Sequence, residues 1–337
     1  MSGNAINNTA TTSIHPEQFW MRPVSFAGLL RVVQLASEHG DGLRAADLNA
    51  KIKEQNIYRT ERGTPSPTTL YHCRNTLLRL GVMGRRNSRY FVNRDLPQVE
   101  ALLSEMSPRS GELSLIVRDA FADLVLRNQD CRAAFFDLFT DGKQVSAAEF
   151  RLTAQSVTWN RVTQNDRRTV VLVSRTSAKT VLSSASEIKS VLYGVRYWAR
   201  EELRLTDEFF RDDRGAVMYP IRNENQNVDA TINEILGHVS QNEEWTTFSL
   251  PDLAVICCEE QRRPLEILRA AIRKLTVSFP GQVVTVPTSR AFATIAARSR
   301  QREELELRVY FRDAQNRYVS HLKIHKSLSE KKQWQAI

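Results

Sequence analysis

The chain has 337 residues, of which 42% are hydrophobic and 25% are charged. This length suits two or three packed domains, and this composition is that of a globular protein, which excludes the disordered and fibrous classes. The formal net charge of +9 permits nucleic acid or another anionic surface as a partner.

The sequence predicts neither a membrane span nor an export signal. It contains no run of about 18 or more apolar residues, and its first segment, MSGNAINNTATTS, is polar and uncharged. The four cysteines, Cys73, Cys131, Cys257 and Cys258, include no C-x-x-C pair and are interpreted as buried, reduced thiols. We therefore expect a cytoplasmic protein without a membrane partner, in which residues 1–22 form a disordered leader.

The basic excess is concentrated near the N-terminus. Residues 1–95 contain 13 Lys and Arg against 7 Asp and Glu, a balance of +6, whereas residues 96–150 contain 5 against 9, a balance of −4. A nucleic-acid partner is therefore expected at the N-terminal segment first.

Three helices and a hairpin are predicted over residues 23–95. Apolar residues recur at helical spacing over residues 26–36, and a shorter pattern covers residues 46–53. A third helix begins with Ser66 as its N-cap and Pro67 in the first position, and it ends before Gly81. Residues 82–92 then predict a β-hairpin with a basic turn.

These elements resemble the winged-helix superfamily of DNA-binding domains. The resemblance covers roughly a fifth of the chain, and it rests on the pattern of elements instead of a fixed motif. It implies that residues 67–80 form a recognition helix for the major groove, that residues 84–90 form the wing, and that double-stranded DNA is the partner.

The predicted third helix has one apolar and one polar face. Leu70, Cys73, Leu77 and Leu80 share the apolar face. Asn can pair with adenine and Arg with guanine in the major groove, so the polar side is suited to reading bases. The predicted DNA-contacting residues of this helix are Thr68, Tyr71, His72, Asn75 and Arg79. The alternative is a winged helix that binds protein.

Three arginines occupy the predicted wing. Arg85, Arg86 and Arg89 fall within five residues, and such arginines commonly contact phosphate or enter a minor groove. A solvated basic turn is the alternative interpretation.

A second basic stripe is predicted farther along the chain. Lys189, Arg196 and Arg200 recur at helical spacing within a helix expected over residues 186–204, so they are predicted to follow a phosphate backbone. Ordinary surface ion pairs with the neighbouring acidic residues are the alternative.

The whole chain is predicted to be of the mixed α+β class, in five segments. After the leader and the winged helix at 23–95 come a helical connector at 96–142 and a central α+β region at 143–225. The helix-rich C-terminal region, residues 226–337, is expected to contain helices from Ser249 and Pro264, a further helix over 289–304 and a hairpin over 305–325 that turns at 313–316. Helices followed by a hairpin admit a second winged helix there.

Catalytic residues are less clearly indicated. Asp207, Asp212 and Asp213 cluster beside the basic helix, where a DNA glycosylase or nuclease could use a carboxylate to activate water, although Asp is also common in turns. His321 and His325 lack a third ligand, so no metal is expected. No phosphate-binding glycine loop occurs, so no nucleotide cofactor is expected either.

Three functions fit these observations. The first is a sequence- or structure-selective DNA-binding protein, such as a transcription regulator or replication initiator. The second is a DNA glycosylase or nuclease in repair or in defence against foreign or phage DNA, to which the winged helix delivers substrate. The third is an assembly subunit whose winged helix binds protein. The sequence leaves homo-oligomerisation open.

Overall fold

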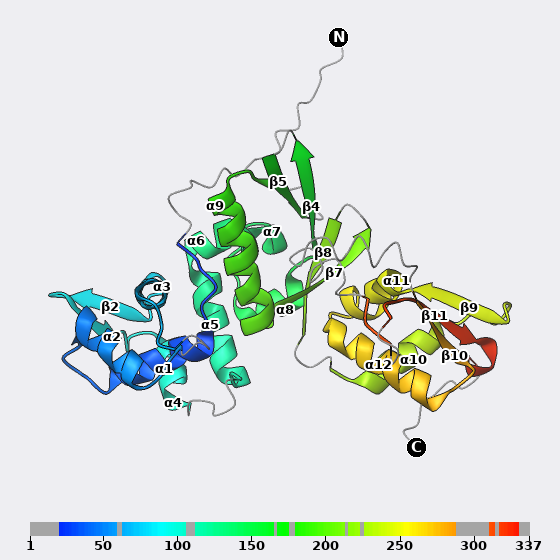
Figure 1. The fold of residues 1–337 in the computed structure, drawn as a ribbon, viewed down its shortest axis with the longest axis horizontal. Coiled ribbons are helices and arrows are strands. Elements are labelled where there is room, and N and C mark those ends of the chain that lie inside the picture. The colour runs from blue at the N-terminus through cyan, green and yellow to red at the C-terminus, as the bar shows by residue number, and fades with distance from the viewer. Residues whose placement is uncertain are drawn as a thin grey trace, which may run out of the picture. The chain divides into compact units, whose positions relative to one another are not determined.

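The computed structural model describes residues 20–58, 63–105, 112–164, 167–174, 179–212, 215–222, 226–287, 310–313 and 317–329, with backbone only at 160–168 and 210–215. Helices and sheets are both present, which confirms the predicted mixed α+β class (Figure 1). The chain divides into two compact units: Met1–Ala154 with Val162–Leu205, and Gln155–Arg161 with Thr206–Ile337. The predicted boundaries after residues 95 and 142 therefore fall inside the first unit.

The first unit begins with three helices and a small antiparallel sheet. In chain order these are α1 (Phe26–Ser37), β1 (Leu43–Arg44), α2 (Ala45–Glu54), α3 (Pro67–Arg79), β2 (Met83–Arg86) and β3 (Arg89–Val92). The sheet order is β1-β3-β2, so the chain also contains one short strand that the sequence pattern did not predict. Asn87 and Ser88 join β2 to β3 with φ of 50° and 61°, as two-residue hairpin turns require.

A helical layer completes the first unit. It consists of α4 (Pro97–Ser104), α5 (Leu115–Arg127), α6 (Gln129–Cys131), α7 (Asp137–Thr140), α8 (Ala147–Thr153) and α9 (Ala185–Ile188), with the hairpin β5 (Arg167–Ser174) and β6 (Lys179–Leu182). α9 continues through two π-helical segments, Lys189–Val195 and Trp198–Glu202. A third π-helical segment, Arg132–Phe136, joins α6 to α7.

Aromatic packing and one carboxylate hold α1 against this layer. The buried ring of Phe26 lies 4.7 Å from that of Phe121 and 5.3 Å from that of Trp198, both in edge-on geometry. The carboxylate of Glu202 accepts hydrogen bonds from the backbone N–H of Phe26 at 2.8 Å and from the hydroxyl of Tyr197 at 2.7 Å. The first amide of α1 is thereby satisfied from a segment far along the chain.

The end of the predicted disordered leader is packed. Trp20 and Met21 are buried, and the indole N–H of Trp20 donates to Asp130 at 2.8 Å. Met21 crosses the helix at Gly194, where an added Cβ would lie 3.2 Å from the Met21 carbonyl oxygen. The prediction of disorder is therefore wrong for residues 20–22, because Trp20 and Met21 are buried in the helical layer and Arg22 is hydrogen-bonded to Ser190. Residues 1–19 lie outside the described residues.

The second unit contains two sheets. β8 (Gly215–Pro220) pairs with β7 (Thr206–Asp212) and with residues 157–160 of β4 (Val157–Gln164). The following elements are α10 (Val228–Gly237), β9 (Trp245–Ser249), α11 (Leu250–Ala254), α12 (Leu265–Ser278), β10 (Val283–Pro287) and β11 (Val319–His325), and a π-helical segment, Val255–Glu259, extends α11. Arg312 pairs with Tyr318 across the predicted turn, whereas the predicted helix 289–304 lies outside the described residues.

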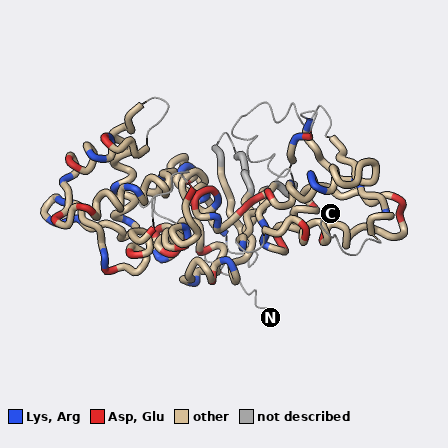
Figure 2. The backbone as a smooth tube through the Cα atoms, turned by 90° about the horizontal axis from the view of Figure 1, so that it is seen from below, with Lys and Arg blue, Asp and Glu red and all other residues tan. Residues whose placement is uncertain are grey.

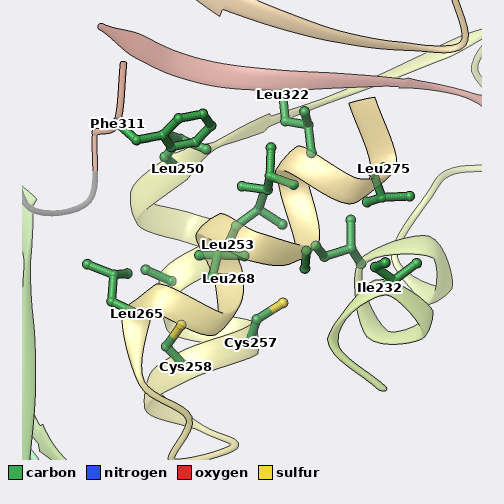
Figure 3. Close-up of a cluster of buried hydrophobic side chains, with 14 of the residues drawn as sticks. Ile232, Leu250, Leu253, Cys257, Cys258, Leu265, Leu268, Leu275, Phe311 and Leu322 are labelled. Atoms are coloured by element: carbon green, nitrogen blue, oxygen red, sulfur yellow. The ribbon is translucent and has the colours of Figure 1, made fainter. Parts of the chain in front are cut away.

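The C-terminal elements repeat the topology of residues 26–92. The described elements of both segments run helix, strand, helix, helix, strand, strand, and in both the third strand lies between the other two, in the orders β1-β3-β2 and β10-β11-β9. α3 and its C-cap bury Leu70, Cys73, Thr76, Leu77 and Leu80, and α12 buries Leu265, Leu268, Ala271, Ile272 and Leu275 at the same spacing. Figure 3 shows α12 residues meeting Ile232, Leu253 and Leu322 in the core.

None of the helices in the described part of the chain combines the length and the apolar character that crossing a bilayer requires.

Candidate nucleic-acid interface

α3 presents its polar face to solvent. Thr68 and Arg79 are exposed, His72 and Asn75 are half-buried, and Tyr71 is 57% exposed. The side chains of Leu70, Cys73 and Leu77 are buried on the opposite face, which fixes the rotation of the helix. All five predicted contact residues of this helix are therefore available to a ligand that approaches its outer side.

Hydrogen bonds define both ends of α3. The hydroxyl of Ser66 accepts the backbone N–H of Thr69 at 3.1 Å, as an N-cap does. At the other end, the side-chain amide of Asn128 donates to the carbonyl oxygen of Arg79 at 2.8 Å. The helical layer thus ties down the last turn of α3 and leaves its first turn, which favours anions, open.

His72 lies in a positive environment. Burial lowers its pKa, and the charges of Arg22 and Lys189 lower it further. The guanidinium of Arg22 donates to the hydroxyl of Ser190 at 2.8 Å, which brings residues 22 and 189 together beside α3. The Nδ1 atom of His72 is buried without a hydrogen-bond partner, so Nε2 is the ring nitrogen that can donate to an anion.

The β2–β3 hairpin displays the predicted wing arginines. Arg85, Arg86 and Arg89 are all exposed. Arg89 donates to the carbonyl oxygen of Gly42 at 3.0 Å, and the Arg85 guanidinium lies 5.8 Å from the ring centroid of Tyr90. These contacts orient the hairpin arginines without burying them.

The second predicted stripe is divided by the structure. Lys189 is exposed and lies in the electrostatic environment of α3. Arg196 is only 4% exposed, and Arg200 is half-buried and donates to Glu201 at 2.6 Å. The predicted exposed stripe is therefore wrong for Arg196. Its spacing assumed an α-helix, whereas the i→i+5 hydrogen bonds of a π-helix rotate successive residues differently.

Asp207 has a structural role. It is 5% exposed; one carboxylate oxygen accepts the backbone N–H of Glu208 and the other that of Leu265, each at 2.8 Å. Leu265 is the first residue of α12, whose N-cap, Pro264, offers no side-chain acceptor. Asp207 therefore caps this helix from β7. The side chain of Asp212 and all of Asp213 lie outside the described residues.

Among the residues that the structure describes, no group of three or more His, Cys, Asp or Glu side chains could hold a metal ion.

α12 does not reproduce the polar surface of α3. The matching buried spacing places Glu266, Ile267, Ala270 and Lys274 where α3 has Tyr71, His72, Asn75 and Arg79. The ammonium of Lys274 already pairs with Asp229 at 2.7 Å. At these matched positions α12 therefore lacks the histidine, asparagine and arginine of α3, and its exposed Arg273 lies at a different position on the helix.

Basic and acidic residues are interspersed along the backbone of each unit (Figure 2). Net charge alone therefore does not identify the interface, which is defined by the side chains that share one surface. The sequence pattern missed Arg22 and Asn128, because their partners lie 168 and 49 residues away. No local signal marks such pairs.

No family model matches the sequence, and no curated protein or solved structure shows a significant similarity to it.

The assignment of Asp207 to helix capping predicts a loss of stability when its carboxylate is removed. Asp207→Ala should lower the free energy of unfolding by about 1–3 kcal/mol, because it leaves buried N–H groups unsatisfied. Asp207→Asn should cost less, since its amide oxygen still accepts one hydrogen bond. Chemical denaturation measures the difference. The exposed Glu243→Ala, outside any helix or strand of the same unit, is the control, with a change within about 0.5 kcal/mol. Unchanged stability in Asp207→Ala would contradict the capping role.

Proposed function

We propose that this protein binds double-stranded DNA as a winged-helix protein, with α3 in the major groove and the β2–β3 hairpin against the phosphate backbone. The supporting observation is that the polar side chains of α3 face outward beside exposed cations that come from other segments of the same unit. Such an arrangement combines groups that read bases with groups that position the protein on phosphate.

Within this surface, side-chain chemistry separates the residues that can read bases from those that can bind phosphate. Asn75 and Arg79 can make paired hydrogen bonds to purine edges, and Thr68 and His72 can donate to phosphate or bases. Arg85, Arg86 and Lys189 are charged and exposed, so they supply the electrostatic part of the affinity. The protein would therefore discriminate sequence through α3 and hold the duplex through the hairpin and Lys189.

We propose selective binding, as in a regulator or initiator, instead of DNA cleavage or base excision. Both oxygens of Asp207, the first of the three predicted catalytic carboxylates, already accept backbone N–H groups. Purified protein incubated with unmodified and hypermodified duplexes should therefore leave them free of breaks and alkali-labile sites. Four free, buried cysteines support a reducing cytoplasm as the compartment.

Removal of the hairpin charges tests the electrostatic part. In Arg85→Ala/Arg86→Ala, the slope of log K against log salt should become shallower by about 2, because each phosphate contact contributes roughly 0.9. Fluorescence anisotropy with a labelled duplex across a salt series measures this slope. Lys179→Ala removes an exposed cation from β6 and should leave the slope unchanged. Equal slopes for the double variant and the wild type would contradict a DNA-contacting hairpin.

Asn75 tests base reading. A duplex selected from a random library by the wild type should lose about 1–3 kcal/mol of its preference over other sequences in Asn75→Ala, because a paired contact to a base is lost. Nonspecific affinity should change much less. Competition binding with selected and scrambled duplexes measures both quantities. Asn233→Ala, on the exposed side of α10, is the matched control. Retention of the full preference by Asn75→Ala would overturn the role of α3 as reader.

His72 predicts a pH dependence of binding. Its lowered pKa keeps the ring neutral in the free protein near pH 7. A phosphate at Nε2 would raise that pKa, so binding takes up a proton and affinity rises as the pH falls through the raised value. The gain is about tenfold for each unit between the bound and free pKa values. Binding titrations from about pH 8 to 5.5 should show a steeper rise for the wild type than for His72→Gln, which donates without titrating. Parallel profiles would exclude His72 from the interface.

A further inference from the structure

A cavity of about 480 Å³ opens in the first unit, and none of its lining residues is among those assigned to DNA. It is lined by Gln98 of α4, by Asp123 and Arg127 of α5, and by Gln144, Val145 and Ser146 in the segment that leads into α8. This volume is within the range of small-molecule sites. Three separate elements contribute to the wall, so the cavity depends on how α4 and α5 pack together.

The lining combines polar and apolar surface and contains one cation, Arg127, and one carboxylate, Asp123. The guanidinium of Arg127 is exposed and donates to the side-chain oxygen of Gln98 at 3.3 Å, a long hydrogen bond. One oxygen of Asp123 accepts the backbone N–H of Ala147 at 2.7 Å. A planar guanidinium pairs bidentately with a carboxylate, and the two carboxamides of the wall can bind the polar remainder of a ligand.

The cation of the cavity adjoins the residue that holds the end of α3. Arg127 is the last residue of α5, and Asn128 follows it directly. The side chain of Asn128 donates to the carbonyl oxygen of Arg79 at 2.8 Å and accepts the backbone N–H of Cys131 at 3.0 Å. A movement of the C-terminal end of α5 is therefore transmitted to the last turn of α3 by the hydrogen bond between Asn128 and Arg79.

The helix that contributes Gln98, α4, is bonded to α1. The side-chain amide of Gln34, on α1, donates to the carbonyl oxygens of Leu102 and Glu105 at the end of α4, at 3.4 and 2.7 Å. The cavity is therefore bounded by two helices that both contact α1, α4 through Gln34 and α5 through Phe121, while only the end of α5 is hydrogen-bonded to α3 through Asn128. A ligand that changes the spacing of α4 and α5 also biases the placement of α3 relative to α1.

We propose that this cavity binds a small carboxylate-bearing molecule that changes the affinity of α3 for DNA. The carboxylate pairs with Arg127 in place of the weak hydrogen bond to Gln98, and the carboxamides of Gln98 and Gln144 bind its polar groups. Ligand binding requires only the cavity, whereas the regulatory effect rests on the proposed DNA-binding function. Because the coupling is reciprocal, DNA must change ligand affinity by the same factor.

Calorimetry of the full chain without DNA tests the site. The probes are succinate and L-glutamate, with succinamide as an uncharged molecule of matched size. At least one carboxylate should bind the wild type, and binding should weaken at least about tenfold in Arg127→Gln, which removes the charge-assisted pair. Lys143→Gln removes a nearby exposed cation that does not line the cavity and should bind normally. Thermal melting verifies that each variant is folded, and Gln144→Ala provides a second cavity variant.

Three results would overturn the site: no heat from either carboxylate up to about 10 mM, equal binding of succinamide, or unchanged affinity in both Arg127→Gln and Gln144→Ala.

DNA binding with and without the probe tests the coupling. The affinity should change by about fivefold or more in the wild type. Asn128→Ala should retain the probe and lose most of this change, because it removes the hydrogen bond to Arg79. Bound probe with unchanged DNA affinity would overturn the regulatory role. A protein that binds the probe and no DNA would instead refute the proposed function and leave the ligand site standing.

Discussion

The burial of Phe26 between Phe121 and Trp198 is the constraint on which the proposed interface depends. Together with the Glu202 carboxylate on the first amide of α1, it joins the N-terminal helices to the helical layer as one compact unit. Aromatic side chains of this size contribute most of the burial energy at such a contact, and the carboxylate satisfies an amide that would otherwise be costly to bury. With α1 held in this way, α3 has a fixed neighbour on one side and solvent on the other.

The same attachment gives α3 an environment that residues 26–92 alone would lack. Residues 20–22 lie across Gly194 and bring Arg22 to Ser190, so that Lys189 adds a positive charge beside His72. Asn128 secures the far end of the helix. The outer face of α3 is thus a composite surface, in which the residues proposed to read bases come from one segment and part of the charge comes from others. Such a surface can respond to changes in the helical layer.

The C-terminal elements share the strand order and the buried spacing of residues 26–92, but not the chemistry of their exposed side chains. α3 and α12 bury residues at the same spacing within sheets of the same order, yet their exposed positions differ in chemistry. The buried positions satisfy the hydrophobic core, whereas the exposed positions are free to vary. Fold repetition therefore gives no reason to extend the proposed reading function to α12, where Glu266 and Ala270 replace the side-chain types that pair with bases.

The sequence by itself determined the features that depend on neighbouring residues. Ser66 and Pro67 defined the start of α3, its apolar spacing defined which face turns outward, and the residues around Asn87 predicted a hairpin with exposed arginines. Only the tertiary structure decided the rest. Arg196 is buried because π-helical segments change the rotation that α-helical spacing assumes, and Asp207 caps a helix that begins 58 residues later. Lys189 reaches α3, and Arg127 borders a cavity, through the packing of distant segments. Periodicity and capping act over one or two turns, whereas burial, charge neighbourhoods and cavities arise from contacts between residues that the chain brings together only when it folds.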